Sequence, residues 1–131
     1  MTPYPKDIKI RFGDVKEIFF RVRERQWDAA TSKWVPGDYR DLTGYTVLSQ
    51  VRATSEDTTV LLSFTATLGN QSDVENGRGS VFLKVTSAQT AAVARTVTTA
   101  VWDCQLTDSG GNTNTYVGGA VTFEKDVSRA V

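Results

Sequence analysis

The chain has 131 residues, a length that fits one folded domain with a hydrophobic core of its own. Fifteen Lys and Arg residues balance fifteen Asp and Glu residues, and this zero net charge argues against a general nucleic-acid binder and against electrostatic attraction to an anionic membrane. Histidine is absent and cysteine occurs once, which excludes His-dependent triads, His metal sites and an intrachain disulfide framework.

The N-terminal part of the chain predicts a short arm followed by a strand. Residues 1–6 lack the plan of a signal peptide and are expected to form a flexible arm. In residues 7–12, Ile8, Ile10 and Phe12 alternate with charged residues, which is the period-2 pattern of a half-buried strand. No apolar run here or later in the chain is long enough for a transmembrane helix.

A second strand is predicted over residues 16–25. Its apolar face carries Ile18, Phe20 and Val22, and its charged face carries Glu17, Arg21, Arg23 and Arg25. Phe19 falls on the charged face, either as a lone surface aromatic or as part of a contact with another chain. Pairing with neighbours on adjacent strands explains the arginines most simply, and an acidic partner surface is the alternative.

Residues 26–41 form the first irregular stretch, predicted as a long loop or an extended hairpin tip. This stretch contains Trp27 and Trp34, with Tyr39 close by. One interpretation is that the tryptophans close over the end of the core. Another is that they contact a second protein, because Trp, Tyr and Arg are favoured at interface hot spots. A carbohydrate-binding platform is the third.

Four segments in the middle of the chain predict three strands and a polar loop between the second and the third. Residues 45–52 follow a turn at Gly44 and carry apolar residues on both faces, as in a central strand covered on both sides. Residues 60–68 give the longest alternating run in the chain. Residues 69–79 are polar and turn-rich, so we expect a mobile loop there. Residues 80–85 then return as a strand with Val81, Leu83 and Val85 facing inward.

The C-terminal third predicts a helix and a β-hairpin. Residues 86–94 are rich in alanine, a strong helix former, and Thr86 or Ser87 can cap the first turn. Residues 99–123 alternate on both sides of a turn at residues 108–112, and Trp102 is the largest candidate for a core anchor. Cys104 shares the inward register of Trp102 and is interpreted as a small buried residue. Residues 125–131 are expected to form a flexible tail.

These patterns predict a single domain over residues 1–131, with seven or eight strands and one short helix near residues 86–94. An antiparallel β-sandwich is favoured over a barrel. The core is predicted to contain Ile18, Phe20, Val51, Leu62, Phe64, Leu83, Trp102, Cys104, Leu106, Val121 and Phe123.

No constellation of catalytic or metal-ligating residues stands out. The carboxylates of Glu17, Asp41 and Asp103 are scattered along the chain, and nothing brings two of them to the separation a glycosidase needs. The turn that starts at Asp108 superficially suggests a calcium loop, but an EF-hand would need an acidic residue where Gly119 stands. We therefore expect no enzyme activity, no cofactor and no bound metal.

Four segments, in this order, carry a family resemblance. They are Gly13-Asp14 followed by residues 18–23; residues 41–46 running into residues 50–52; residues 79–86 with the Ala-rich turn to Ala92; and residues 102–108, then 118–121, ending at residues 126–129. This arrangement resembles small immunoglobulin-like bacteriophage tail and baseplate structural proteins, including the N-terminal domain of baseplate upper proteins. Residues 26–40 depart from the pattern, because the stretch is longer and richer in tryptophan than the short loop expected there.

The resemblance implies an immunoglobulin-like β-sandwich that serves as a non-enzymatic structural component of a virion, assembled in the bacterial host cytoplasm. Its partners would be other virion structural proteins and copies of itself in a symmetric multi-copy assembly, with no nucleic acid and no membrane. The alternatives are a capsid cement or decoration protein, and a carbohydrate-binding module that uses Trp27, Trp34 and Tyr39. The residues predicted to contact partners are Phe19, Arg21, Arg23, Trp27, Trp34 and Tyr39.

Overall fold

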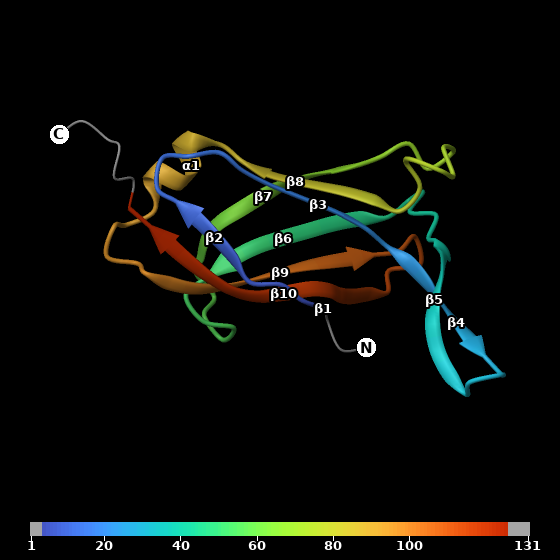
Figure 1. Cartoon of the computed structure of the whole chain (residues 1–131). Helices are drawn as coiled ribbons and strands as arrows, with labels where there is room; N and C mark the ends of the chain where they lie inside the picture. The colour runs from blue at the N-terminus through green and yellow to red at the C-terminus, as the bar shows by residue number, and fades with distance from the viewer. Residues whose placement is uncertain (1–3, 126–131) are drawn as a thin grey trace.

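The computed structural model describes residues 4–125 and shows an all-β chain with one short helix (Figure 1). Its elements are β1 (Tyr4–Pro5), β2 (Ile8–Arg11), β3 (Lys16–Arg21), β4 (Arg23–Asp28), β5 (Lys33–Tyr39), β6 (Thr46–Arg52), β7 (Val60–Leu68), β8 (Ser80–Val85), α1 (Ser87–Ala92), β9 (Thr99–Thr107) and β10 (Thr113–Glu124). Apart from Lys125, the predicted tail lies outside the described residues, as do the first three residues of the predicted arm.

Eight of the strands form one strongly curled sheet in the order β1-β10-β9-β6-β7-β8-β3, with β2 also paired to β10. The strand β7 joins the two halves of this sheet, because its first half pairs with β6 and its second half pairs with β8. The two ends of the sheet come together where Phe20 of β3 stacks on Tyr116 of β10, with ring centroids 5.5 Å apart. The sheet is therefore nearly closed around its core.

The strands at the N-terminus correct two expectations. Both β1 and β2 run parallel to β10, so the sheet is mixed, whereas the other pairings within residues 4–125 are antiparallel as predicted. Residues 4–6 do not form a free arm, because Lys6 N–H donates to the Gly118 carbonyl over 2.9 Å. The close approach of Lys6 to β10 requires glycine at position 119, where a Cβ atom would lie 2.5 Å from the Lys6 carbonyl oxygen.

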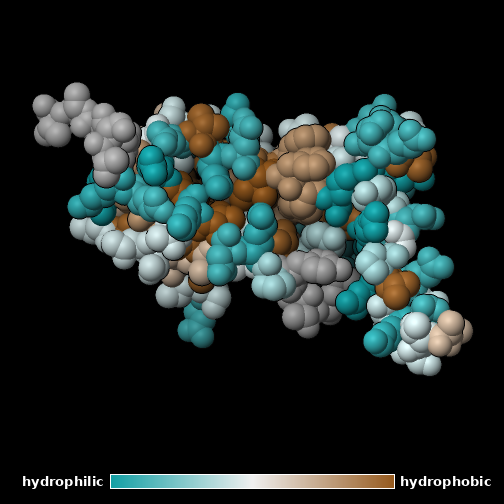
Figure 2. All heavy atoms as spheres, in the orientation of Figure 1, coloured by the Kyte–Doolittle hydropathy of each residue, from teal (hydrophilic) through white to brown (hydrophobic). Residues whose placement is uncertain are grey.

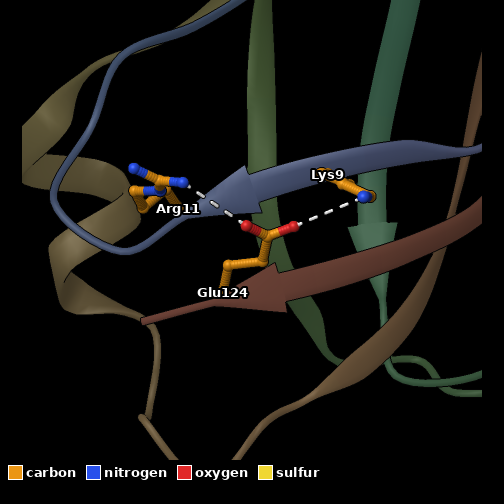
Figure 3. Close-up of polar contacts among 3 residues, drawn as sticks. All are labelled: Lys9, Arg11 and Glu124. Atoms are coloured by element: carbon orange, nitrogen blue, oxygen red, sulfur yellow. Dashed lines mark ion pairs between the residues drawn. The ribbon is translucent and has the colours of Figure 1, made fainter. Parts of the chain in front are cut away.

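Ion pairs also connect β2 to β10. The Glu124 carboxylate lies 3.7 Å from Lys9 Nζ and 3.5 Å from Arg11 Nη2 (Figure 3). These side chains are between 35% and 76% exposed, so the pairs add little stability. The hydrophobic face of β2, with Ile8 and Ile10 buried, is the main reason that the strand stays on the sheet.

The core confirms most of the sequence prediction. The predicted core residues that are buried are Ile18, Val51, Leu62, Phe64, Leu83, Trp102, Cys104, Leu106, Val121 and Phe123. Phe20 is only half-buried, since it lies at the seam where the ends of the sheet meet. The strand β6 is central, but it is not covered on both sides, because Leu48 on its outer face is exposed.

The short helix α1 also confirms the prediction for residues 86–94, although it is shorter by three residues. Thr86 and Gln89 form a capping box, in which the Thr86 hydroxyl accepts from Gln89 N–H over 3.2 Å. The buried Thr90 hydroxyl donates to the Asp14 carbonyl over 2.8 Å and ties the helix to the turn after β2. No helix within residues 4–125 is long and apolar enough to cross a membrane.

The single strand predicted over residues 16–25 is two separate strands in the structure. The alternating run of residues 16–25 is interrupted at Val22, where β3 ends and β4 begins in a different sheet. Val22 N–H donates to the Gly79 carbonyl, and the Val22 carbonyl accepts from Arg40 N–H, both over 2.8 Å. These long-range bonds anchor the buried Val22 and let the following residues leave the main sheet.

Candidate functional site

The strands β4 and β5 form a separate two-stranded hairpin that projects from one end of the molecule (Figures 1 and 2). Its register pairs Arg23 with Tyr39 at the base, and Trp27 with Trp34 next to the tip. Figure 2 shows hydrophobic atoms exposed on this hairpin among hydrophilic ones. A lone hairpin is only marginally stable in water, so the way in which this one is held in place matters.

The tryptophan pair is the most exposed aromatic feature of the hairpin. Trp27 and Trp34 have 51% and 60% of their surface exposed, and their rings meet edge to face with centroids 5.4 Å apart. The interpretation that these tryptophans close over the end of the core is therefore wrong. The hairpin leaves the main sheet at Val22, and within residues 4–125 no strand of the main sheet pairs with it.

The turn at the tip is well defined. The Asp28 carboxylate accepts from Ala30 N–H over 3.0 Å and from the Thr31 hydroxyl over 2.9 Å. Ser32 completes the reversal with a φ angle of 53°. This turn places Trp27 and Trp34 directly opposite each other and limits the conformations that the tip can adopt.

The base of the hairpin is held by contacts of two arginines with one aromatic ring. Arg21 Cζ lies 3.3 Å from the centroid of the Tyr39 ring, and Arg23 Cζ lies 4.7 Å from it. Arg23 also donates to the Tyr39 hydroxyl over 3.3 Å. The hydrogen bond and charge of Arg23 hold the pKa of the Tyr39 phenol below its usual value. Three predicted interface residues are thus brought together at one place.

The Arg21 guanidinium makes several hydrogen bonds within the chain. Its Nε and Nη2 atoms donate to the Arg78 carbonyl over 3.1 and 2.9 Å, and its Nη1 atom donates to the Glu75 carbonyl over 2.9 Å. Arg21 is therefore a positioning residue that connects β3, the hairpin and the loop before β8. Arg23, which is exposed on β4, has more freedom to meet an acidic group of a partner.

The polar loop of residues 69–79, which the sequence predicts to be mobile, supports the base instead. Gln71 Oε1 accepts from Leu42 N–H and from Gly79 N–H, each over 2.9 Å, and Gln71 Nε2 donates to the Gly69 carbonyl over 2.7 Å. Gly79 has a φ angle of +79°, and a Cβ atom there would lie 2.5 Å from the Val22 carbonyl oxygen. The loop therefore closes tightly on the point where the hairpin begins.

The remaining predicted interface residue, Phe19, belongs to a second surface. It lies on the outer face of β3, where its ring contacts that of Phe82 on β8. Sequence reasoning missed Phe82, although the inward register of Val81, Leu83 and Val85 already implies that Phe82 points outward.

The acidic residues do not gather. Within residues 4–125, no three His, Cys, Asp or Glu side chains form a group that could hold a metal ion. Burial raises the pKa of Asp103, whereas hydrogen bonds from Thr43 lower the pKa of Asp41, and backbone hydrogen bonding from Asn112 lowers that of Asp108. Burial also raises the pKa of the Cys104 thiol to about 12, as expected for an unreactive core cysteine.

No protein-family model matches the chain, and no curated protein matches it significantly. The geometry of the hairpin β4–β5 is therefore the basis for assigning a function.

Proposed function

We propose that the chain is a non-enzymatic docking protein of a bacteriophage virion, which uses the hairpin β4–β5 to bind neighbouring subunits in the tail, baseplate or fibre-attachment region. The observation that carries this proposal is the exposed pair of Trp27 and Trp34 on a projecting hairpin whose tip and base are both held by hydrogen bonds. Exposed tryptophans of this kind are typical anchors of protein interfaces.

The energetics of the tryptophan pair suit a docking role. Burying the exposed half of each ring removes roughly 100 Å² of mainly apolar surface from water, which corresponds to about 2.5 kcal/mol per ring. The defined turn at Asp28 reduces the entropy lost on binding. A single contact of this size is modest, so repeated copies in one assembly would provide the remaining affinity.

The strand pairings support an immunoglobulin-like sandwich as the finer description of the fold. The order β6-β9-β10 matches strands C, F and G of such a domain, and the pair β3-β8 matches strands B and E. The second half of β7, beside β8, takes the place of strand D. In this description the hairpin β4–β5 is an insertion between strands B and C, at the stretch that departs from the family resemblance.

The virion assignment rests on that resemblance, and the docking assignment rests on the hairpin. A flat sugar-binding platform is less favoured, since the two tryptophan rings are inclined at 67° to each other. A cement protein on the capsid would use the same hairpin at a different place on the particle.

The test is the position of the protein on purified phage particles, with and without the tryptophan pair. We expect cryo-EM to show the chain on the tail or baseplate with β4–β5 in a subunit contact, and Trp34→Ala to reduce its incorporation about tenfold. Leu48→Ala is the matched control, because Leu48 is 51% exposed on the main sheet.

Each other outcome contradicts a particular part of the proposal. Absence of the protein from purified particles would overturn the virion assignment, and density on the capsid would select the cement alternative. Glycan binding by the isolated monomer that is lost in Trp34→Ala would select the carbohydrate-binding module.

A further inference from the structure

A second exposed aromatic pair lies on the outer face of β3 and β8. Phe19 and Phe82 are directly opposite in the register, with ring centroids 4.9 Å apart, and 53% and 47% of their surfaces are exposed. They line a groove of about 720 Å³ whose other side is formed by Thr65 and Thr67 of β7. Single exposed apolar residues are common, whereas these two phenylalanines lie side by side across two strands and beside a groove.

The neighbouring pair of register partners on this face, one on β3 and one on β8, carries one charge of each sign. Glu17 on β3 is the register partner of Lys84 on β8, and the two charged groups are 3.9 Å apart with both side chains more than half exposed. The face thus has an aromatic row, Phe19–Phe82, and a charged row, Glu17–Lys84. In both rows, one residue comes from β3 and the other from β8.

We propose that this face binds the same face of a second copy of the chain around a two-fold axis. An axis parallel to the strands, between β3 and β8, places β3 of each copy over β8 of its partner and leaves the rows aligned. Phe19 then meets Phe82 of the second copy, and Glu17 meets Lys84 of the second copy. A two-fold interface requires such self-complementarity, which a surface with one sign of charge does not have.

The size of the face sets the strength of the contact. Residues of β3, β7 and β8 line it, and its exposed aromatic side chains are Phe19 and Phe82. We therefore expect the dimer to bury less than the roughly 1,200 Å² of a stable protein complex. The isolated protein is therefore a weak dimer, and the contact becomes effective where other contacts bring copies together. The dimer face uses none of the residues of the hairpin β4–β5.

Sedimentation from about 10 μM to about 1 mM protein tests the proposal directly, since this range covers weak association. We expect a monomer–dimer equilibrium whose association constant falls at least tenfold in Phe82→Thr. Leu48→Thr, an equally exposed change on β6, should leave the constant unchanged. A protein that stays monomeric throughout, or a dimer that Phe82→Thr does not weaken, would overturn the proposal and leave the face to a different partner.

Charge variants of Glu17 and Lys84 provide a sharper test. Their expected result would not arise if this ion pair only stabilised the single chain. Glu17→Lys alone and Lys84→Glu alone each put like charges at this position, so each variant should dimerise more weakly than the parent chain. Mixing the two variants pairs opposite charges across the axis, and we expect heterodimers favoured at least tenfold over either homodimer at low salt. In about 1 M salt, where the screening length is about 3 Å, this preference should largely disappear. No preference for the heterodimer at low salt would refute the alignment.

The test remains separate from the docking function of the hairpin. Trp34→Ala should leave the dimerisation constant unchanged while it lowers incorporation into particles. If Trp34→Ala abolished dimerisation, the dimer would be formed by the hairpin instead, and the β3–β8 assignment would be wrong.

Discussion

Two hairpins in this molecule carry its tryptophans, and they use them in opposite ways. In β9–β10, Trp102 is 3% exposed, its indole N–H donates to the Lys6 carbonyl over 2.7 Å, and its ring meets Phe64 edge to face. In β4–β5, Trp27 and Trp34 are more than half exposed and contact each other. The same residue type therefore holds the fold together in one hairpin and is available to a partner in the other.

The difference comes from what lies on each side of the strands. The strand β9 is flanked by β6 and β10, and its inward face is covered by the curled sheet, so burial of Trp102 stabilises the fold. The strands β4 and β5 have only each other as partners within residues 4–125. Their tryptophans gain burial only when a second protein supplies the missing layer.

The largest effect expected from this comparison is on Trp102. Trp102→Ala should lower the free energy of unfolding by about 3 to 5 kcal/mol, because it leaves a cavity beside Phe64 and removes the hydrogen bond to Lys6. Urea denaturation followed by circular dichroism measures the change. A loss under about 1 kcal/mol would contradict the role of Trp102 as a core anchor.

The contacts of Arg21, which hold the hairpin β4–β5 to the main sheet, should give the next largest effect. Arg21→Met removes the hydrogen bonds to the Arg78 and Glu75 carbonyls and the contact with Tyr39, so we expect a loss of about 1.5 to 3 kcal/mol in the same measurement. Arg25→Met, on the exposed part of β4, is the matched control and should change stability by less than about 0.5 kcal/mol. Equal effects of the two substitutions would mean that Arg21 does not anchor the hairpin.

Alternation and capping signals were sufficient to predict most strands of the main sheet and its helix. The inward registers of β7, β8, β9 and β10 and the helix α1 follow from local patterns, because each has one buried face or a complete capping box. The hairpin β4–β5 gave no such signal, since residues 23–27 are all exposed and have no apolar face to alternate. The sequence shows tryptophans in this stretch, but composition alone does not show whether a tryptophan is buried.

The other features that the sequence did not predict depend on contacts between residues far apart in the chain. The alternation of Ile18, Phe20 and Val22 is unbroken, and the break after Val22 comes from its backbone bonds to Gly79 and Arg40. The parallel pairing of β1 with β10 depends on the small size of Gly119 and on the bond from Trp102 to Lys6. Such contacts leave no periodic trace in the sequence, whereas the outward position of Phe82 could have been read from its neighbours.

A smaller, pH-dependent effect is expected at Asp103, on the outer side of β9. Burial raises the pKa of this carboxyl in the folded protein, so the folded state binds more protons than the unfolded state between the unfolded pKa of about 3.9 and the raised folded value. Ionised Asp103 therefore costs stability at neutral pH, and solvent screening keeps the cost small. Asp103→Asn should increase stability at pH 7 more than at pH 3, as measured by urea denaturation. A gain that is the same at both pH values would exclude this cause.

The smallest effect on stability is expected where the effect on assembly is largest. Trp34→Ala should change the free energy of unfolding by less than about 0.5 kcal/mol, because the ring is already 60% exposed and lies on the projecting hairpin. The same urea denaturation that is used for Trp102→Ala provides the measurement. A loss comparable to that of Trp102→Ala would show that the tryptophan pair holds the hairpin together. The two hairpins would then differ in position but not in role, and the docking surface would have to lie elsewhere.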